Sequence, residues 1–245
     1  MLAIIGGSGL SKLGNMAVKD RKSARTPYGE PSGDLTFGRI GDASVVFLAR
    51  HGEGHTITPH EVNYRANLWA LKEAGAESVL SIATVGGIRK NLAPGALVVP
   101  DQIIDYTWGR ASTFFQGPGA PVNHIDFTEP YSRRLRERLL AAAAASGEYV
   151  LDRGVYAATQ GPRLETAAEI NRLERDGADV VGMTAMPEAA LAREISLEYA
   201  AIAVVANYAA GRGESRHAVP LERLAAVIEE AMGRVRRIIE RLCTK

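Results

Sequence analysis

The sequence predicts an α/β fold built as a single domain. Short apolar runs without alternation are typical of strands that are covered on both faces of a sheet. Helical patterns separate these runs, and that order is typical of α/β proteins. The 245 residues contain no internal repeat and no linker, and this length is enough for one domain to bury a continuous core. We therefore expect residues 1–245 to form one unit.

The predicted strands are the short apolar runs of the chain. They are rich in Val, Ile, Leu and Ala and are too short for helices of ordinary length. In chain order they are Leu2–Ile5, Val45–Ala49, Ser78–Ala83, Ala96–Val99, Val150–Ala157, Asp179–Val181 and Tyr199–Ala206.

Five segments predict helices because their apolar residues recur at helical spacing. The last is the clearest, since its apolar stripe alternates with charged residues. Gly147 follows an alanine run and predicts the end of the second helix. The five predicted helices are Val62–Glu73, Tyr131–Ala145, Glu165–Arg175, Pro187–Glu194 and Leu221–Leu242.

The composition excludes several classes of partner. A net charge of +1 provides no field that would attract nucleic acid or an anionic membrane, so a small molecule is expected. The single cysteine, Cys243, cannot form an intramolecular disulfide and is compatible with a reducing compartment. No stretch approaches ~20 uninterrupted apolar residues, and the first apolar run is too short for a signal peptide. We expect a cytoplasmic protein that does not enter a membrane.

The segment Trp108–Phe127 is the least regular part of the chain. It contains several glycines and prolines together with three phenylalanines. A long loop with aromatic residues needs apolar burial to become ordered, so it is more often functional or part of an interface than idle.

Three predicted strands end in residues that suit an anion. Gly6–Gly9 places glycines and the hydroxyl of Ser8 after the first strand, although a plain tight turn is an alternative. The spacing matches neither a dinucleotide-binding fingerprint nor a Walker loop. Arg50 follows the second strand, and Thr84–Gly87 follows the third. Because α/β folds bind ligands at the carboxyl ends of their strands, these features together favour an anion site.

Metal binding and covalent catalysis are not expected. The histidines His51, His55, His60 and His124 lie in no His-Glu-x-x-His motif, and the lone cysteine forms no Cys-x-x-Cys pair. No Gly-x-Ser-x-Gly elbow is present, and Ser8 has no identifiable base.

A set of motifs gives the chain a resemblance to a known family over almost its whole length. The landmarks are Gly6–Leu10, Thr26–Gly29, Ala49–Gly52, Val62–Asn67, Val85–Gly87, Gly161–Thr166 and Gly182–Glu188. Because these motifs occur in this order, the chain resembles the trimeric purine nucleoside phosphorylase and methylthioadenosine phosphorylase family. The resemblance implies a mixed sheet with a distorted barrel flanked by helices, and a homotrimer. It also implies phosphorolysis with inorganic phosphate as co-substrate and no cofactor.

The resemblance assigns roles to particular positions. It implies that phosphate is held by Ser8, Arg50, His51, Thr84 and Thr184. Met183 is expected to pack beneath the sugar, and His124 to reach the active site of a neighbouring subunit, although an ordinary loop histidine is the alternative.

Two residues predict the identity of the base. Asn207 stands where the 6-aminopurine branch of the family carries an aspartate, and an amide can donate to a 6-oxo group as an ionised aspartate cannot. Glu165 matches the glutamate that accepts N1–H of hypoxanthine or guanine, a proton that adenine lacks. A first-turn helix residue favoured by the helix dipole is the alternative for Glu165. Together they favour a 6-oxopurine.

The sugar end points to the methylthio branch. Near Pro220-Leu221 the ribonucleoside branch has a histidine for the 5′-hydroxyl, whereas Leu221 suits an S-methyl group. His217 is close enough in sequence to be an alternative. The combined hypothesis is conversion of 5′-methylthioinosine and phosphate to hypoxanthine and 5-methylthioribose 1-phosphate. Methylthioadenosine, inosine or guanosine as substrate, nonenzymatic nucleoside binding, and hydrolysis by water remain alternatives.

Overall fold

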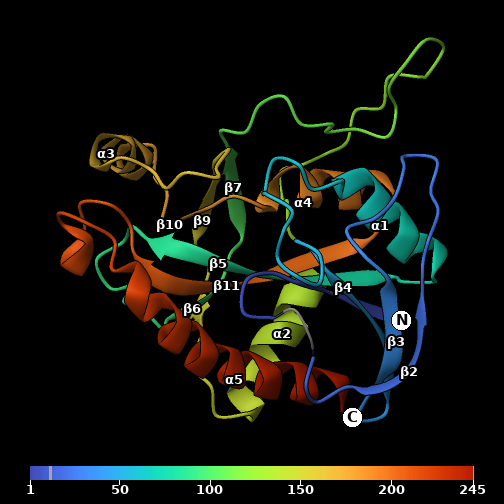
Figure 1. Ribbon diagram of the computed structural model, residues 1–245, viewed down its shortest axis with the longest axis horizontal. Coiled ribbons are helices and arrows are strands. Elements are labelled where there is room, and N and C mark those ends of the chain that lie inside the picture. Colours follow the sequence, from blue (N-terminus) through green and yellow to red (C-terminus); the bar gives the residue numbers. More distant parts are fainter. Residues whose placement is uncertain (11–12, 245) are drawn as a thin grey trace.

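The computed structural model describes residues 1–10 and 13–244 and confirms an α/β fold in which a large mixed sheet is flanked by helices (Figure 1). The strands are β1 (Leu2–Gly6), β2 (Ala17–Lys22), β3 (Leu35–Ile40), β4 (Ala43–Ala49), β5 (Ser78–Gly87), β6 (Leu97–Val99), β7 (Gln102–Asp105), β8 (Leu151–Asp152), β9 (Val155–Ala158), β10 (Val180–Gly182) and β11 (Glu198–Tyr208). The helices are α1 (Tyr64–Glu73), α2 (Arg133–Ala145), α3 (Ala167–Arg175), α4 (Ala185–Glu194) and α5 (Leu224–Cys243). Two short 3₁₀ turns, Gly213–Ser215 and Leu221–Arg223, precede α5.

The sheet forks at β5, its most extensively paired strand. One path through it has the order β2-β3-β4-β1-β5-β10-β9-β7, and β11 pairs with β5 and leads through β6 to β8. β1 runs parallel to β4 and β5, and β5 runs parallel to β11. The carboxyl ends of these four strands therefore meet at one edge, where an α/β fold usually binds its ligand.

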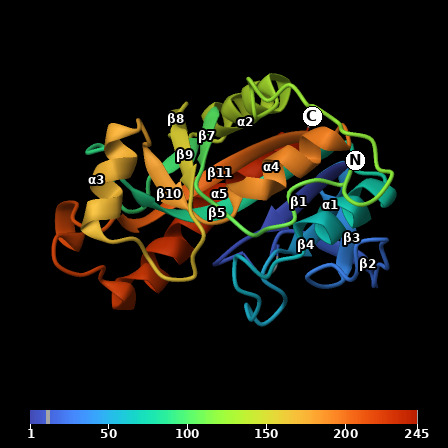
Figure 2. The same ribbon diagram turned by 90° about the horizontal axis from the view of Figure 1, so that it is seen from above.

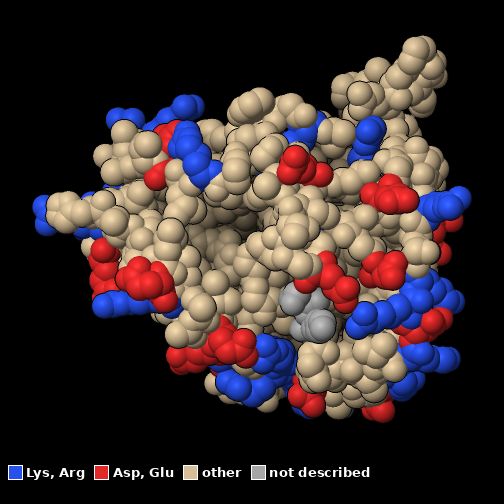
Figure 3. Space-filling view, in the orientation of Figure 1, with Lys and Arg blue, Asp and Glu red and all other residues tan. Residues whose placement is uncertain are grey.

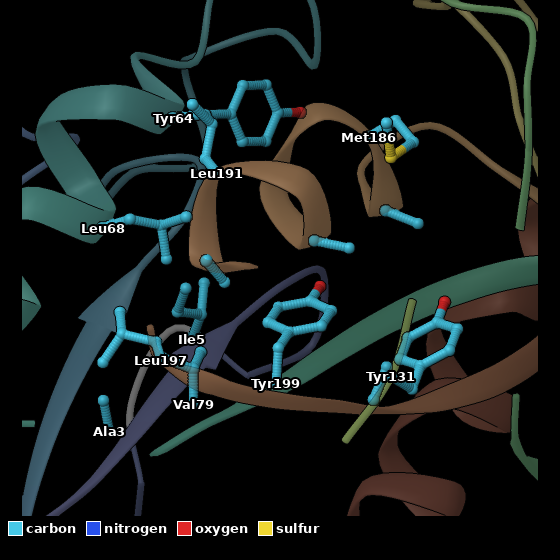
Figure 4. Packing of buried hydrophobic residues seen from close by; sticks show 14 of the residues in the cluster. Ala3, Ile5, Tyr64, Leu68, Val79, Tyr131, Met186, Leu191, Leu197 and Tyr199 are labelled. Atoms are coloured by element: carbon cyan, nitrogen blue, oxygen red, sulfur yellow. The ribbon is translucent and has the colours of Figure 1, made fainter. Parts of the chain in front are cut away.

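The central strands β1, β5 and β11 are buried on both faces, which explains their continuous apolar runs. Ile5 and Tyr199 belong to the core beneath α1 and α4, as Figure 4 shows. Ile4 and Ile202 belong to the core on the other face, which contains residues of α2 and α5. In Figure 1 these two helix pairs lie on opposite sides of β5 and β11, whereas α3 lies at one end of the molecule, as Figure 2 also shows.

Three of the five helices, α1, α2 and α3, begin at residues whose side chains cap them. Asn63 caps α1, and Ser132 caps α2, each through a side-chain oxygen that accepts a backbone N–H. Thr166 and Glu169 form a capping box at the start of α3. Gly147, with φ of +72°, follows the end of α2 as the sequence predicts.

Three strands lie outside the sequence prediction, and one predicted strand is divided. β2 has the sequence AVKDRK with every residue exposed, and β3 and β7 contain charged or polar residues. The run predicted as Val150–Ala157 is split into β8 and β9 because Arg153 has φ of +73° and breaks the extended backbone. The five predicted helices are present, with boundaries shifted by a few residues.

Candidate active site

A cavity of about 620 Å³ opens at the carboxyl ends of β1, β4, β5 and β11. Figure 3 shows a central hollow in the surface whose walls carry few charged side chains. Residues far apart in the sequence form its wall, because the parallel strands end at the same edge. Of the site residues predicted from the sequence, nine line it: Ser8, Arg50, His51, Thr84, Glu165, Met183, Thr184, Asn207 and Leu221.

All five residues predicted to hold phosphate line this cavity. Ser8 follows β1, and Arg50 and His51 follow β4. Thr84 lies in the second half of β5, and Thr184 follows β10. Hydroxyl groups, a guanidinium and an imidazole in one hollow form a set of polar groups suited to an oxyanion.

Arg50 forms the floor of this region. It has no exposed surface, yet it borders the cavity next to Gly7. A Cβ atom on Gly7 would lie 2.9 Å from Nη1 of Arg50 and 2.6 Å from the carbonyl oxygen of Ile82. Glycine is therefore required there so that the β1 loop can approach the guanidinium. Burial works against the charged form, but Glu188 raises the pKa of Arg50 above its usual range.

His51 is held as a neutral imidazole. Its Nδ1 lies 2.8 Å from the carbonyl oxygen of Ile57, so Nδ1 carries the proton and donates. Burial, and then the nearby charge of Arg50, lower the pKa of His51 to about 4. The remaining ring nitrogen, Nε2, is then an acceptor, which suits a protonated phosphate oxygen better than a fully ionised one.

Glu165 and Asn207 line the same cavity. Oε1 of Glu165 accepts a hydrogen bond of 2.6 Å from the hydroxyl of Thr159. Nδ2 of Asn207 donates to the carbonyl oxygen of Tyr208 at 2.7 Å, which leaves Oδ1 and a second N–H of the amide. The site therefore has a carboxylate acceptor and an amide that can both donate and accept.

A β-bulge sets the direction of Asn207. β11 keeps register with β5 up to Val205, opposite Val85, and the next pair is Asn207 opposite Gly86. The extra residue places Asn207 on the other face from Val205, whose side chain is in the core.

The remaining predicted contacts concern the sugar. Met183 packs against Gly161, where an added Cβ would lie 2.4 Å from its sulfur. Leu221 is 61% exposed and lines the cavity together with apolar neighbours at Val219, Leu224 and Ile228. His217, the alternative candidate for the 5′ substituent, is exposed and lies outside the cavity wall formed by the described residues.

His124 lies away from the cavity of its own chain. It is exposed on the long segment between β7 and α2, part of which extends from the body of the molecule in Figure 1. Trp108 and Val122 on the same segment are 72% and 81% exposed.

Sequence reasoning missed two polar residues that hold the site together. Glu188, within a recognised motif but given no role, pairs with Arg50 through a bond of 2.7 Å. Arg110 donates to the carbonyl oxygens of Met183 and Gln160 at 2.8 and 2.9 Å and so ties the long loop to two segments of the wall. The only signal in the sequence was that Arg110 is the one basic residue other than His124 in the segment Trp108–Phe127.

Neither a cluster of metal-ligating side chains nor a membrane-spanning helix is present among the described residues. No group of three or more His, Cys, Asp or Glu side chains is placed there to hold a metal ion. No helix within residues 1–10 and 13–244 has the length and apolar character to cross a membrane.

Comparison with known proteins gives matches over nearly the whole chain. Residues 1–244 match the family model described as the phosphorylase superfamily. A probable S-methyl-5′-thioinosine phosphorylase of Pseudomonas syringae is 52% identical over 98% of this chain and 97% of its own. A 6-oxopurine nucleoside phosphorylase of Pyrococcus furiosus is 48% identical over 86% of this chain and 80% of its own. Methylthioadenosine phosphorylase from Schistosoma mansoni, in complex with adenine, superposes with a TM-score of 0.93 at 33% identity, covering 99% of this chain and 90% of that one.

Proposed function

The chain belongs to the phosphorylase superfamily, and from this premise we propose that it cleaves 5′-methylthioinosine with inorganic phosphate. The C1′–N9 bond breaks, an oxygen of hydrogen phosphate forms a new bond to C1′, and the proton that the phosphate loses is balanced by the one that the purine gains, giving hypoxanthine and 5-methylthioribose 1-phosphate. The relatives of Pseudomonas syringae and Pyrococcus furiosus, named for a methylthio-nucleoside and for 6-oxopurine nucleosides, support this proposal.

The chemistry requires stabilisation of opposite charges at two ends of the breaking bond. The sugar becomes oxocarbenium-like and the purine leaves with negative charge. The bound phosphate lies beside the cationic sugar, stabilises it and then attacks. Ser8, Thr84 and Thr184 would hold the ion, with Arg50 as the floor beneath it.

The observation that carries the choice of base is the presence of Glu165 and Asn207 in one cavity. The Glu165 carboxylate would accept N1–H of hypoxanthine. The uncommitted N–H of Asn207 would donate to O6, and its Oδ1 would accept from a protonated N7. The bond that Asn207 donates to O6 strengthens as negative charge develops on the leaving base, so this contact favours the transition state over the bound substrate.

The apolar wall at the sugar end supports a 5′-methylthio substituent. Val219, Leu221, Leu224 and Ile228 present hydrocarbon to the cavity. A 5′-hydroxyl bound against this wall without a partner would lose its hydrogen bonds to water, whereas a methylthio group would not.

The proposal includes a homotrimer in which His124 completes the active site of a neighbouring subunit. Its support is the exposure of His124, Trp108 and Val122 on one extended segment. The mass of the particle, from light scattering after size-exclusion chromatography, tests the trimer. Mixing inactive His124→Ala chains with inactive Asn207→Ala chains tests the shared site, because mixed trimers would regain part of the activity. No recovery in mixed trimers would overturn the shared site.

The substrate proposal is tested with four nucleosides at equal concentration, with and without phosphate. Methylthioinosine should give the highest kcat/KM, ahead of methylthioadenosine, inosine and guanosine. A preference for methylthioadenosine would overturn the base assignment, and a preference for inosine or guanosine would overturn the sugar assignment. Cleavage without phosphate would identify a hydrolase. Binding without cleavage would identify a nucleoside-binding protein.

A further inference from the structure

The most deeply buried acidic side chain near the cavity belongs to Glu188, in the first turn of α4. It is 1% exposed, and its partner Arg50 is 0% exposed. Nε of Arg50 donates to Oε2 at 2.7 Å, and Nη2 donates to Oε1 at 3.0 Å. Removing two charges from water costs several kcal/mol for each ion, so a pair this deep calls for a role beyond stability.

Two hydroxyl groups fix the carboxylate in this orientation. Ser81 on β5 donates to Oε1 at 2.7 Å, and Tyr199 on β11 donates to the same atom at 2.8 Å. The Ser81 oxygen also accepts a bond of 2.7 Å from Nη2 of Arg50. Glu188 is therefore tied to the two longest strands of the sheet, and through Ser81 the same strand holds the guanidinium.

The hydrogen bonds of Arg50 account for all but one of its N–H groups. A guanidinium has five N–H donors. Glu188 takes one from Nε and one from Nη2, Ser81 takes the second from Nη2, and the carbonyl oxygen of Ile82 takes one from Nη1 at 3.0 Å. One N–H on Nη1 has no partner in the part of the chain that the structure describes. Nη1 is also the atom next to Gly7, at the cavity floor.

We propose that Glu188 is a positioning residue for the phosphate, and this rests on the proposed function. It holds the guanidinium so that a single N–H of Nη1 is presented to the oxyanion, and it cancels the charge of Arg50. Arg50 then binds phosphate through one directed hydrogen bond more than through net positive charge. Such a donor needs no reorganisation when the charge on the reacting oxygens changes.

Substitution of Glu188 by glutamine separates this role from that of a plain counter-ion. If Glu188 only neutralised Arg50, Glu188→Gln would leave a free positive charge at the floor and phosphate would bind more tightly. A positioning role predicts the opposite. The glutamine NH₂ group cannot accept the bonds that Arg50 donates, so the guanidinium turns and phosphate binds more weakly.

Two variants test the role while keeping the ion pair, in case Glu188→Gln does not fold. Ser81→Ala and Tyr199→Phe each remove one bond to Oε1, and Ser81→Ala also removes the bond that Nη2 of Arg50 donates to Ser81. Tyr131→Phe is the matched control, because Tyr131 is buried, stacks on Tyr199 with ring centroids 5.8 Å apart, and its hydroxyl has no partner among the described residues. The dissociation constant of phosphate is measured by calorimetry on the folded protein, and KM for each substrate by steady-state kinetics.

The expected result is a specific loss of phosphate affinity. The phosphate dissociation constant should rise about tenfold or more in Glu188→Gln and about threefold in Tyr199→Phe and Ser81→Ala. The KM for the nucleoside should stay within about twofold, and Tyr131→Phe should match the wild type on both measures.

Three outcomes would overturn the proposed function or the positioning role. A wild-type protein that binds no phosphate would overturn the proposed function, and the positioning role with it. If the wild type binds phosphate and the dissociation constant in Glu188→Gln or Tyr199→Phe is unchanged or lower, the positioning role alone would be overturned. Equal losses in Tyr199→Phe and Tyr131→Phe would also overturn it, because they would show a general packing effect.

Discussion

Asn207→Asp is the substitution that most directly tests how the base is bound. It replaces an amide by an isosteric carboxylate and so changes charge and hydrogen bonding without changing volume. In the structure, Nδ2 of Asn207 lies 2.7 Å from the carbonyl oxygen of Tyr208. An ionised aspartate would place two oxygens against each other there, so the side chain must turn away from its present position.

The expected losses of stability and activity follow from the bond to Tyr208 and from the proposed bond to O6. Loss of the bond to Tyr208 should lower the free energy of unfolding by about 1 kcal/mol. Loss of the donor to O6 removes a contact that is strongest in the transition state and should raise the barrier by about 2–4 kcal/mol. The kcat/KM for methylthioinosine should therefore fall by about 30- to 1,000-fold.

The assay follows release of hypoxanthine from methylthioinosine and of adenine from methylthioadenosine by liquid chromatography. The ratio of the two kcat/KM values should shift toward methylthioadenosine, whose 6-amino group can donate to a carboxylate. Asn171→Asp is the control, because Asn171 lies on α3 away from the cavity wall and accepts a bond from Arg212 that a carboxylate can also accept. An unchanged ratio in Asn207→Asp would refute the assignment of Asn207 to the base.

Four further outcomes are expected. Glu165→Ser should lower kcat/KM for methylthioinosine by raising its activation barrier by about 1–3 kcal/mol, and it should lower kcat/KM for methylthioadenosine much less. Equal losses of kcat/KM for the two substrates would contradict a contact with N1–H. Gly7→Ala should raise the KM for phosphate, since its Cβ would lie 2.6 Å from a backbone oxygen, whereas Gly14→Ala meets nothing within 4 Å and should not. Leu221→Ser should reduce the preference for methylthioinosine over inosine about threefold, and an unchanged ratio would place the methylthio group elsewhere. For His51, burial keeps the pKa at about 4, so between pH 6.5 and 4.5 the unfolded chain takes up a proton that the folded chain does not. The free energy of unfolding should fall by up to about 2–3 kcal/mol as pH falls through this window, and His51→Gln should lose that slope in pH-dependent urea titrations.

The parts of the fold that could be predicted are those where burial alone decides the local structure. β1 and β11 are covered on both faces, so nearly every residue had to be apolar and the strands were visible as runs. β2 is held by hydrogen bonds to β3 and carries only exposed side chains, so no hydrophobic pattern could mark it. Its charged sequence is typical of a loop, and only the pairing with β3 makes it a strand.

The candidate site, too, could be predicted only in part. The prediction placed Ser8, Arg50 and Thr84 together because strands in an α/β fold end at a common edge. It could not show that four N–H groups of Arg50 are already bonded, because Glu188 is 138 positions away in the sequence. Likewise, the bulge that turns Asn207 out of the core depends on the register between two strands, which no local pattern specifies.

The wall that would face the 5′ substituent is built outside the sheet. Val219 and Leu221 lie in the segment after β11, and Leu224 and Ile228 lie in the first two turns of α5, none of them fully buried. Ile228 packs against the core, whereas mutations at the other three positions disturb few core contacts, so their effect on folding should be small. A descendant of this chain could therefore exchange one nucleoside for another through changes at these four positions, while the strand ends proposed to hold the anion stayed as they are.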